Sequence, residues 1–188
     1  HTHGDHWNRY TLAHLRGLHV PVYAHPLHHS AMARVDEHAP LRRAGLAREF
    51  PPGGWFPLGP GLRATAVEVP HDSAPTFAFR LEGAGWAVGF ASDVGHPTPA
   101  LAAHLAGVDV LAVEFNHDVG LQKTSRRPKP LIDRVLGTHG HLSNEEAAAL
   151  TRDVARGGGL RHLVQLHLSR ECNRPELAAR AGRDAVGK

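Results

Sequence analysis

Three closely spaced strand candidates are the feature of this sequence that most restricts its fold. They lie at residues 62–69, 76–81 and 86–91, and their short separation predicts an antiparallel meander. Further along the chain, helical and strand-like patterns alternate: residues 108–113 are nearly all apolar and predict a buried strand, and residues 160–166 predict another strand. A chain that mixes hairpins with crossovers predicts an α/β fold in which two sheets are faced with helices.

Capping residues mark the expected helix boundaries. Thr98 and Pro99 open one helix, and Ser143 with Glu146 forms a capping box before an Ala-rich helix that ends near Arg156. The other expected elements are a helix at 7–16, a strand at 20–24, an irregular Pro- and Gly-rich stretch at 40–60, and a last helix capped by Asn173 with Glu176 at its third position.

Bulk composition indicates an ordinary globular chain. Apolar residues make up 41% of its 188 residues and charged residues 21%, and no apolar run approaches the roughly 20 residues of a membrane span. The lone Cys172 cannot form an internal disulfide and no signal-peptide pattern opens the sequence, so we expect a cytoplasmic protein without membrane contact. The length suits a single domain over residues 1–188.

Histidine is the anomaly, with 17 copies. Four residues of metal-binding type, His1, His3, Asp5 and His6, fall at the start of the chain. From a tight turn, His1 and His3 can converge on one ion, while Asp5 and His6 face a second ion from the start of the next helix. A His-rich surface run or a tag remnant is the alternative, but tags are repetitive, whereas Gly4 and Asp5 interrupt this segment.

Three more candidates stand where apolar strands are expected to end, a common location for functional groups in α/β enzymes. They are His71, Asp93 and His167. We expect His71 to complete the first ion site, His167 to complete the second, and Asp93 to bridge the two ions. One strand-end histidine is more often structural, so the prediction depends on the whole set. The set predicts two divalent ions, Zn²⁺ or Mn²⁺, between which these ligand types do not discriminate.

The order of these ligand-type residues resembles that of the metallo-β-lactamase superfamily. HxHxDH at the start is followed by a strand-end histidine, by Asp93 within a Ser-Asp-Val-Gly segment, and by a late histidine. The resemblance implies the αββα sandwich of that superfamily. Its members ordinarily carry strands ahead of HxHxDH, so we expect an N-terminally truncated form whose open sheet edge favours homo-oligomers.

Three later segments, at 113–118, 140–148 and 167–177, resemble the YycJ/WalJ (VicX-like) branch, which is similar to ribonuclease Z. This resemblance implies a metal-dependent nuclease with exonuclease action on nucleic acid. It also implies a proton shuttle of Glu114 and His141, in which His141 protonates the leaving oxygen as general acid. Asp5 is expected to orient the attacking hydroxide as well as to ligate an ion.

The sequence departs from this branch at two places. Cys172 stands where the branch usually has an asparagine, and residues 127–134 match only part of the expected basic segment. A basic loop nonetheless runs from 122 to 134 and suits a phosphate backbone, although a solvated charged loop has the same composition. Three further polar residues are candidates for orienting the ligands: His96, His117 and Asp118.

Two other functions share much of this pattern. A thioester or lactone hydrolase of the same fold needs the metal ligands, but neither the Glu114–His141 pair nor the basic loop. A metal-binding protein without activity would follow from an incomplete site. Metal analysis combined with assays on phosphodiester, thioester and lactone substrates distinguishes the three.

Overall fold

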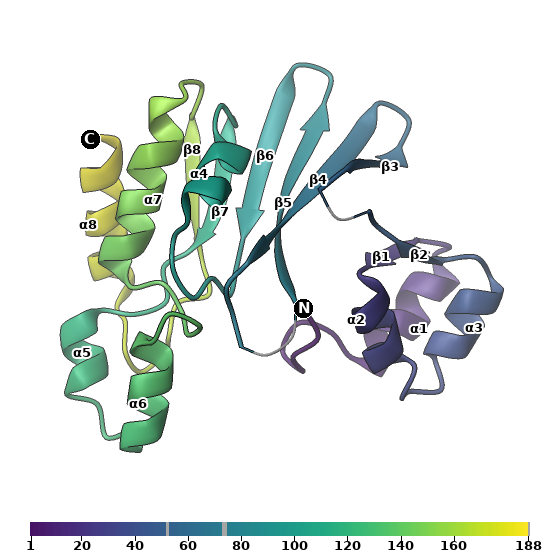
Figure 1. Ribbon diagram of the computed structural model, residues 1–188, viewed down its shortest axis with the longest axis horizontal. Coiled ribbons are helices and arrows are strands. Elements are labelled where there is room, and N and C mark those ends of the chain that lie inside the picture. Colours follow the sequence, from purple (N-terminus) through teal and green to yellow (C-terminus); the bar gives the residue numbers. More distant parts are fainter. Residues whose placement is uncertain (52, 73–74, 188) are drawn as a thin grey trace. The chain divides into compact units, whose positions relative to one another are not determined.

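The computed structural model describes residues 1–51, 53–72 and 75–187, and the chain divides into two compact units (Figure 1). The first unit spans His1–Phe56 and the second Pro57–Lys188. The expected single domain over residues 1–188 remains a prediction. Among the described residues, no helix combines the length and apolar character that crossing a membrane requires.

The first unit is built from short elements around a small apolar core. Helix α1 (Arg9–Gly17) begins after Asn8, whose side chain accepts a hydrogen bond from the Thr11 amide. Strands β1 (Val22–Ala24) and β2 (Ala47–Glu49) pair in parallel. The remaining elements are helices α2 (Pro26–Met32) and α3 (His38–Arg43), and the core consists of Leu12, Ala24, Met32, Leu41 and Leu46.

The large sheet is mixed and has the strand order β3-β4-β5-β6-β7-β8. Its strands are β3 (Trp55–Gly59), β4 (Leu62–Val69), β5 (Thr76–Gly83), β6 (Trp86–Ala91), β7 (Val110–Glu114) and β8 (His162–Leu166). The expected meander is confirmed, because β4 pairs antiparallel with β5 and β5 with β6. Since β6, β7 and β8 are parallel, the carboxyl ends of β4, β6, β7 and β8 meet at one edge of the sheet.

Three helices pack against one face of this sheet: α4 (Pro99–Leu105), α7 (Asn144–Arg156) and α8 (Pro175–Val186). The predicted starts of α4 and α7 are confirmed, since Thr98 accepts from the Leu101 amide and Ser143 forms a capping box with Glu146. The helices bury their apolar residues together with those of the strands in one main core. A mixed sheet flanked by helices confirms the expected α/β class.

Alternation along β6 separates the two faces of the sheet. Ala87 and Ala91 are buried in the main core, whereas Trp86 and Phe90 point the other way and remain 45% and 41% exposed. Val164 of β8 is similarly 44% exposed. The second face is therefore apolar as well, although the described helices α4, α7 and α8 pack on the first.

The segment expected to be a basic loop is largely helical, so that interpretation of its structure was wrong. It forms α5 (Val119–Lys123) and α6 (Lys129–Leu136), joined by a short turn. The Asp118 side chain caps α5 by accepting from the Leu121 amide, and Pro130 lies in the first turn of α6. Helices of one to two turns show too little periodicity to be recognised in a charged segment.

Two other expectations were also wrong. Residues 40–60 contain most of α3 and strands β2 and β3 rather than irregular chain. Arg174, not Asn173, is the N-cap of α8, because Pro175 takes the first helical position. The Asn173 amide instead donates to the Phe115 carbonyl oxygen at 2.8 Å and pairs with Asn144 at 2.9 Å.

Candidate metal centre

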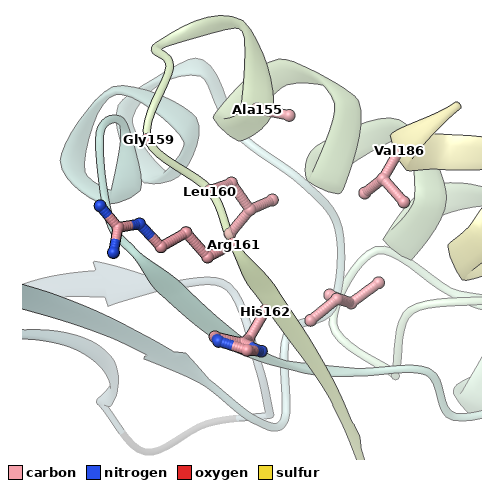
Figure 2. A pocket seen from close by; sticks show the side chains of 7 residues that line it. Ala155, Gly159, Leu160, Arg161, His162 and Val186 are labelled. Carbon is pink, nitrogen blue, oxygen red and sulfur yellow. The ribbon is translucent and has the colours of Figure 1, made fainter.

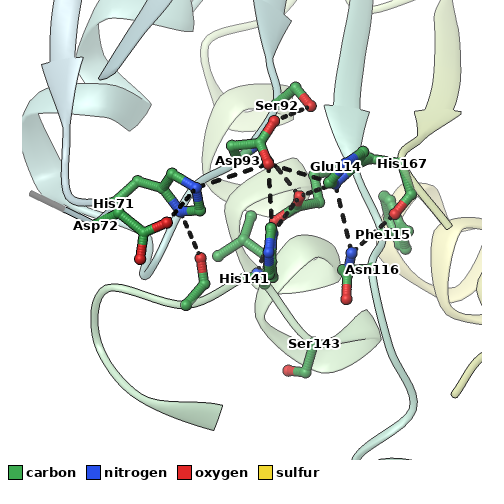
Figure 3. A network of polar contacts seen from close by, with 12 residues as sticks. His71, Asp72, Ser92, Asp93, Glu114, Phe115, Asn116, His141, Ser143 and His167 are labelled. Atoms are coloured by element: carbon green, nitrogen blue, oxygen red, sulfur yellow. Dashed lines mark hydrogen bonds and ion pairs between the residues drawn. The ribbon is translucent and has the colours of Figure 1, made fainter. Parts of the chain in front are cut away.

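Polar side chains gather where four strands of the large sheet end at the same edge (Figure 3). His71 follows β4, Asp93 follows β6, Glu114 closes β7, and His167 follows β8. His141 joins them from the loop between α6 and α7. Four of these residues, Asp93, Glu114, His141 and His167, offer ligand atoms that all lie within 4.8 Å of one another. This donor set is of a kind that can hold a metal ion.

Glu114 lies at the centre of the hydrogen-bond network in Figure 3. Its fully buried carboxylate accepts from His141 Nδ1 at 3.0 Å and from His167 Nδ1 at 2.7 Å. It also accepts from the backbone amides of Asp93 at 3.2 Å and Leu142 at 2.8 Å. Because an ionised carboxylate only accepts, both imidazoles carry a hydrogen on Nδ1 and, when neutral, a lone pair on Nε2.

The pKa of Glu114 reflects two opposing effects. Burial alone would raise this pKa, because the anion loses its hydration. The hydrogen bonds and charges of His141 and His167 outweigh burial and lower the pKa of Glu114 to about 2. Glu114 is therefore an anion at neutral pH, a state that suits a fixed acceptor for two imidazoles.

His71 faces Asp93 from the β4 side of the cluster. Its Nδ1 lies 2.8 Å from the Gly140 carbonyl oxygen, and since a carbonyl only accepts, Nδ1 carries the hydrogen. Its Nε2 lies 3.8 Å from Asp93 Oδ1. Burial is the main cause that lowers the pKa of His71, so the ring is neutral at pH 7, the form in which imidazole binds metals.

Left-handed backbone conformations are concentrated at this edge of the sheet. Asp72, Asp93 and His167 have φ angles of +32°, +56° and +54°. Residues other than glycine rarely adopt such values, and where they do, surrounding contacts hold them in place, often at functional sites. One such contact is the Arg134 guanidinium, which donates two hydrogen bonds to the Asp72 carboxylate.

Two glycines allow the loops around the centre to pack closely. A Cβ atom at Gly95 would lie 2.2 Å from the Thr138 carbonyl oxygen, and one at Gly140 would lie 2.2 Å from the Val135 carbonyl oxygen. These obstacles are backbone atoms, which cannot rotate away. A side chain at either position would therefore push apart the loops that carry the ligand-type residues.

The first unit brings together the four ligand-type residues of its opening turn. The His6 amide donates to the His3 carbonyl oxygen at 3.0 Å, and the His1 ring centroid lies 4.4 Å from those of both His3 and His6. The Asp5 carboxylate lies 3.7 Å from His6 Nε2. The turn thus presents imidazole and carboxylate groups together. That these four residues share one dinuclear centre with His71, Asp93 and His167 remains a prediction.

The three predicted orienting residues take different positions. Asp118 caps α5, and His96 Nδ1 bonds to a loop carbonyl oxygen at 2.9 Å. His117 is buried, and burial lowers its pKa. Asn116 was not among the predicted site residues; its amide donates to the His167 carbonyl oxygen at 2.9 Å and so supports that left-handed turn. A polar residue two positions after the end of β7 was the available signal.

A separate groove lies at the opposite end of β8 from His167 (Figure 2). It has a volume of about 220 Å³ and is lined by Ala155, Gly159, Leu160, Arg161, His162, Leu163 and Val186. Its two ionisable side chains, Arg161 and His162, are exposed, and Arg161 lies 3.5 Å from Asp109. Because the buried titratable groups gather at the other end of the strand, the polar cluster is the candidate site.

Comparison with curated proteins finds bacterial relatives. Exodeoxyribonuclease YycJ of Bacillus anthracis is 27% identical over 172 residues, which cover 88% of this chain and 63% of the relative. Exodeoxyribonuclease WalJ of Streptococcus pneumoniae is 31% identical over 111 residues, which cover 58% of this chain and 40% of the relative. The chain thus spans less than two thirds of the length of either relative.

Solved structures share the fold at low sequence identity. The metallo-β-lactamase fold protein YhfI of Bacillus subtilis has a TM-score of 0.68 and 16% identity, covering 98% of this chain and 69% of that one. Zn²⁺-bound PqqB of Methylobacterium extorquens has a TM-score of 0.60 and 18% identity, covering 88% and 59%. The family model described as the β-lactamase superfamily domain matches residues 1–167. Together with the strand-end cluster, this match shows that the chain belongs to the metallo-β-lactamase superfamily.

Proposed function

We propose that this protein is a metal-dependent phosphodiesterase that acts on DNA as an exonuclease. The observation that carries the proposal is the set of three imidazoles at the sheet edge, each of which donates from Nδ1 to a fixed acceptor. Hydrogen bonds of this kind orient the Nε2 atoms of metal-binding histidines, the proposed role of His71 and His167, and they fix the ring of His141 in the same way. The names of YycJ and WalJ support DNA as the substrate class.

We propose that the ligand-type residues hold two divalent ions. The proposed ligands of the first ion are His1, His3 and His71, those of the second are Asp5, His6 and His167, and Asp93 is proposed to bridge the pair. Imidazole nitrogen and carboxylate oxygen suit Zn²⁺ and Mn²⁺. Bound there, the ions would lower the pKa of a shared water and stabilise the oxygens of the phosphodiester.

His141 is proposed to be the general acid. Glu114 accepts the hydrogen on its Nδ1 and so fixes the orientation of the ring. Nε2 is then the nitrogen from which a proton passes to the leaving oxygen. Glu114 acts through His141 as a positioning residue, and Asp5 is proposed to orient the attacking water.

The test is the His141→Ala variant, assayed for metal content and for turnover of two substrates. On a DNA oligonucleotide, whose leaving oxygen needs a proton, we expect a rate loss of about 10²- to 10⁴-fold. On bis(p-nitrophenyl) phosphate the loss should be much smaller, because p-nitrophenolate leaves without protonation. Both ions should remain bound.

The neighbouring His139 provides the matched control, because its side chain is exposed and its Nδ1 contacts the Thr138 hydroxyl rather than Glu114. His139→Ala should retain full activity on both substrates. Loss of an ion from His141→Ala would make His141 a ligand, and equal losses on both substrates would remove it from the acid role. If the protein hydrolyses thioesters or lactones but not phosphodiesters, it is a thioester or lactone hydrolase and the phosphodiesterase proposal is wrong.

A further inference from the structure

Two neighbouring segments, residues 118–136 and 169–174, carry a concentration of positive charge that we call the basic rim. They contain seven Lys or Arg residues and three carboxylates, a net charge of +4, whereas the whole chain carries +3. The remainder of the chain is therefore slightly negative. Such an asymmetry indicates an anionic partner at this part of the surface.

Two arginines of the basic rim form hydrogen bonds to the loops beside the candidate metal centre. Arg127 donates to the Glu171 carboxylate at 2.7 Å and to the Ser169 hydroxyl at 3.3 Å, in the loop that follows His167. Arg134 donates to the carboxylate of Asp72, the residue after His71. The α5–α6 segment thus reaches the loops that follow two of the strand-end histidines, and Figure 1 shows both helices beyond the end of the sheet.

Part of this charge has no acidic partner in the described part of the chain. Lys123, Arg126 and Arg170 are exposed, and no carboxylate forms an ion pair with any of them there. Arg174 is also exposed and donates to backbone carbonyl oxygens of Glu171 and Asn173. Some cations of the rim are therefore engaged in structure, while others are available to a ligand.

We propose that the basic rim binds the sugar–phosphate backbone of the DNA strand whose terminal bond enters the metal centre. This inference rests on the proposed function. Neither segment contains Phe, Tyr or Trp, so base stacking contributes little and binding should be independent of sequence. Lys123, Arg126 and Arg170 supply point charges for phosphates, while Arg127 and Arg134 hold the rim in place.

The experiment measures binding apart from catalysis, so that it is informative even if hydrolysis fails. Fluorescence anisotropy with a labelled 20-nucleotide single-stranded DNA is recorded in EDTA at several salt concentrations. The combined variant Lys123→Gln, Arg126→Gln and Arg170→Gln should bind about 10- to 100-fold more weakly at 50 mM salt, with a salt slope reduced by roughly 2. Its thermal unfolding should match that of the unaltered chain, because all three side chains are exposed.

The matched control removes three exposed cations from α7 and α8: Arg152→Gln, Arg180→Gln and Arg183→Gln. This variant should bind DNA as the unaltered chain does. Equal weakening in both variants would mean that net charge alone attracts DNA, and no weakening in the rim variant would overturn the proposal. An RNA strand of the same sequence that binds more tightly than the DNA, with the same dependence on the rim, would overturn the assignment to DNA. With bis(p-nitrophenyl) phosphate and added metal, the rim variant should keep full turnover, so failure of the rim and failure of the phosphodiesterase proposal are distinguishable.

Discussion

Two groups of histidines in this chain differ in what accepts their hydrogen bonds. At the sheet edge of the second unit, His141 and His167 share the buried Glu114 carboxylate. In the first unit, His29 Nδ1 lies 3.2 Å from His38 Nε2. The other ring nitrogen of His29, Nε2, lies 2.9 Å from the Arg48 carbonyl oxygen. The histidines at the sheet edge therefore share an anionic acceptor, whereas the pair His29 and His38 has only neutral acceptors.

The acceptor determines which charge state of the imidazole is stable. The carbonyl requires a hydrogen on His29 Nε2, and in the tautomer that leaves His29 Nδ1 without one, Nδ1 accepts from His38 Nε2. Burial, followed by the charges of His29 and Arg42, lowers the pKa of His38. An anionic acceptor instead accommodates a cation or a metal-bound ring. The number of histidines alone therefore does not distinguish the candidate site from the pair in the first unit, whereas the shared carboxylate does.

The largest expected effect comes from removing the shared carboxylate. Glu114→Ala leaves two imidazoles and two backbone amides without their acceptor, and we expect the free energy of unfolding of the second unit to fall by about 3–5 kcal/mol. Urea denaturation followed by circular dichroism measures this change. Glu114→Gln, which keeps one acceptor oxygen, should cost less. A loss below roughly 1 kcal/mol for the alanine variant would show that the carboxylate does not organise the cluster.

Metal affinity provides the next test of the comparison. Loss of a residue that only hydrogen-bonds to a metal ligand weakens metal binding by about 10- to 100-fold. His167→Ala removes a proposed ligand itself, so it should weaken Zn²⁺ binding by more than this. His29→Ala, the matched change in the neutral pair, should leave Zn²⁺ binding unchanged. Competition titration with a chromophoric chelator gives both affinities. Equal losses in the two variants would contradict the distinction between the groups.

A smaller effect is expected from glycine substitutions in the two units. Gly95→Ala places a Cβ against backbone atoms beside the candidate metal centre, and overpacking of this kind costs about 1–3 kcal/mol. Gly17→Ala, at the end of α1, meets no atom within 4 Å and should be neutral or slightly stabilising. Thermal unfolding of the two variants gives the comparison. A neutral Gly95→Ala would show that the surrounding loops adjust.

The smallest expected effect is a pH dependence of the first unit. The folded-state pKa of His38 lies below its ordinary value of 6.5, so below about pH 6.5 the unfolded chain binds the proton more readily than the folded chain. The stability contributed by neutral His38 is therefore present above pH 6.5 and is lost as the pH falls. Hydrogen exchange of the α2 amides between pH 7.5 and pH 5 measures it, and His38→Gln should flatten the profile. An unchanged profile in that variant would assign the dependence to other groups.

Much of the fold was predictable from the sequence because its strands are rich in apolar residues, which alternate with polar ones in β4 and run almost unbroken in β7. The limits of β4 and β6 agree with the prediction, and β7 is displaced by two residues at its start. Helices α2, α3, α5 and α6 were missed, since each is short and three of them are rich in charge or histidine. Their stability comes from packing and, for α2 and α5, from side-chain N-caps rather than from a visible periodicity.

The candidate site was only partly accessible from the sequence. Strand ends could be located, which is why His71, Asp93 and His167 could be grouped before their positions were known. The resemblance implied the pair of Glu114 and His141. The second contact, of Glu114 with His167, depends on the register of β7 against β8, which no local pattern specifies. For the same reason, the bond between Arg134 and Asp72 was not foreseen.

The single carboxylate of Glu114 also restricts how this site can change over evolutionary time. His141 and His167 come from different elements, yet both donate to the same Glu114 oxygen. Replacing either histidine alters the charge balance of the other, so the effects of two substitutions should not add in a double-mutant cycle. Gradual drift by independent single steps is therefore disfavoured here, and lineages that lose one of the three residues should soon lose or exchange the other two.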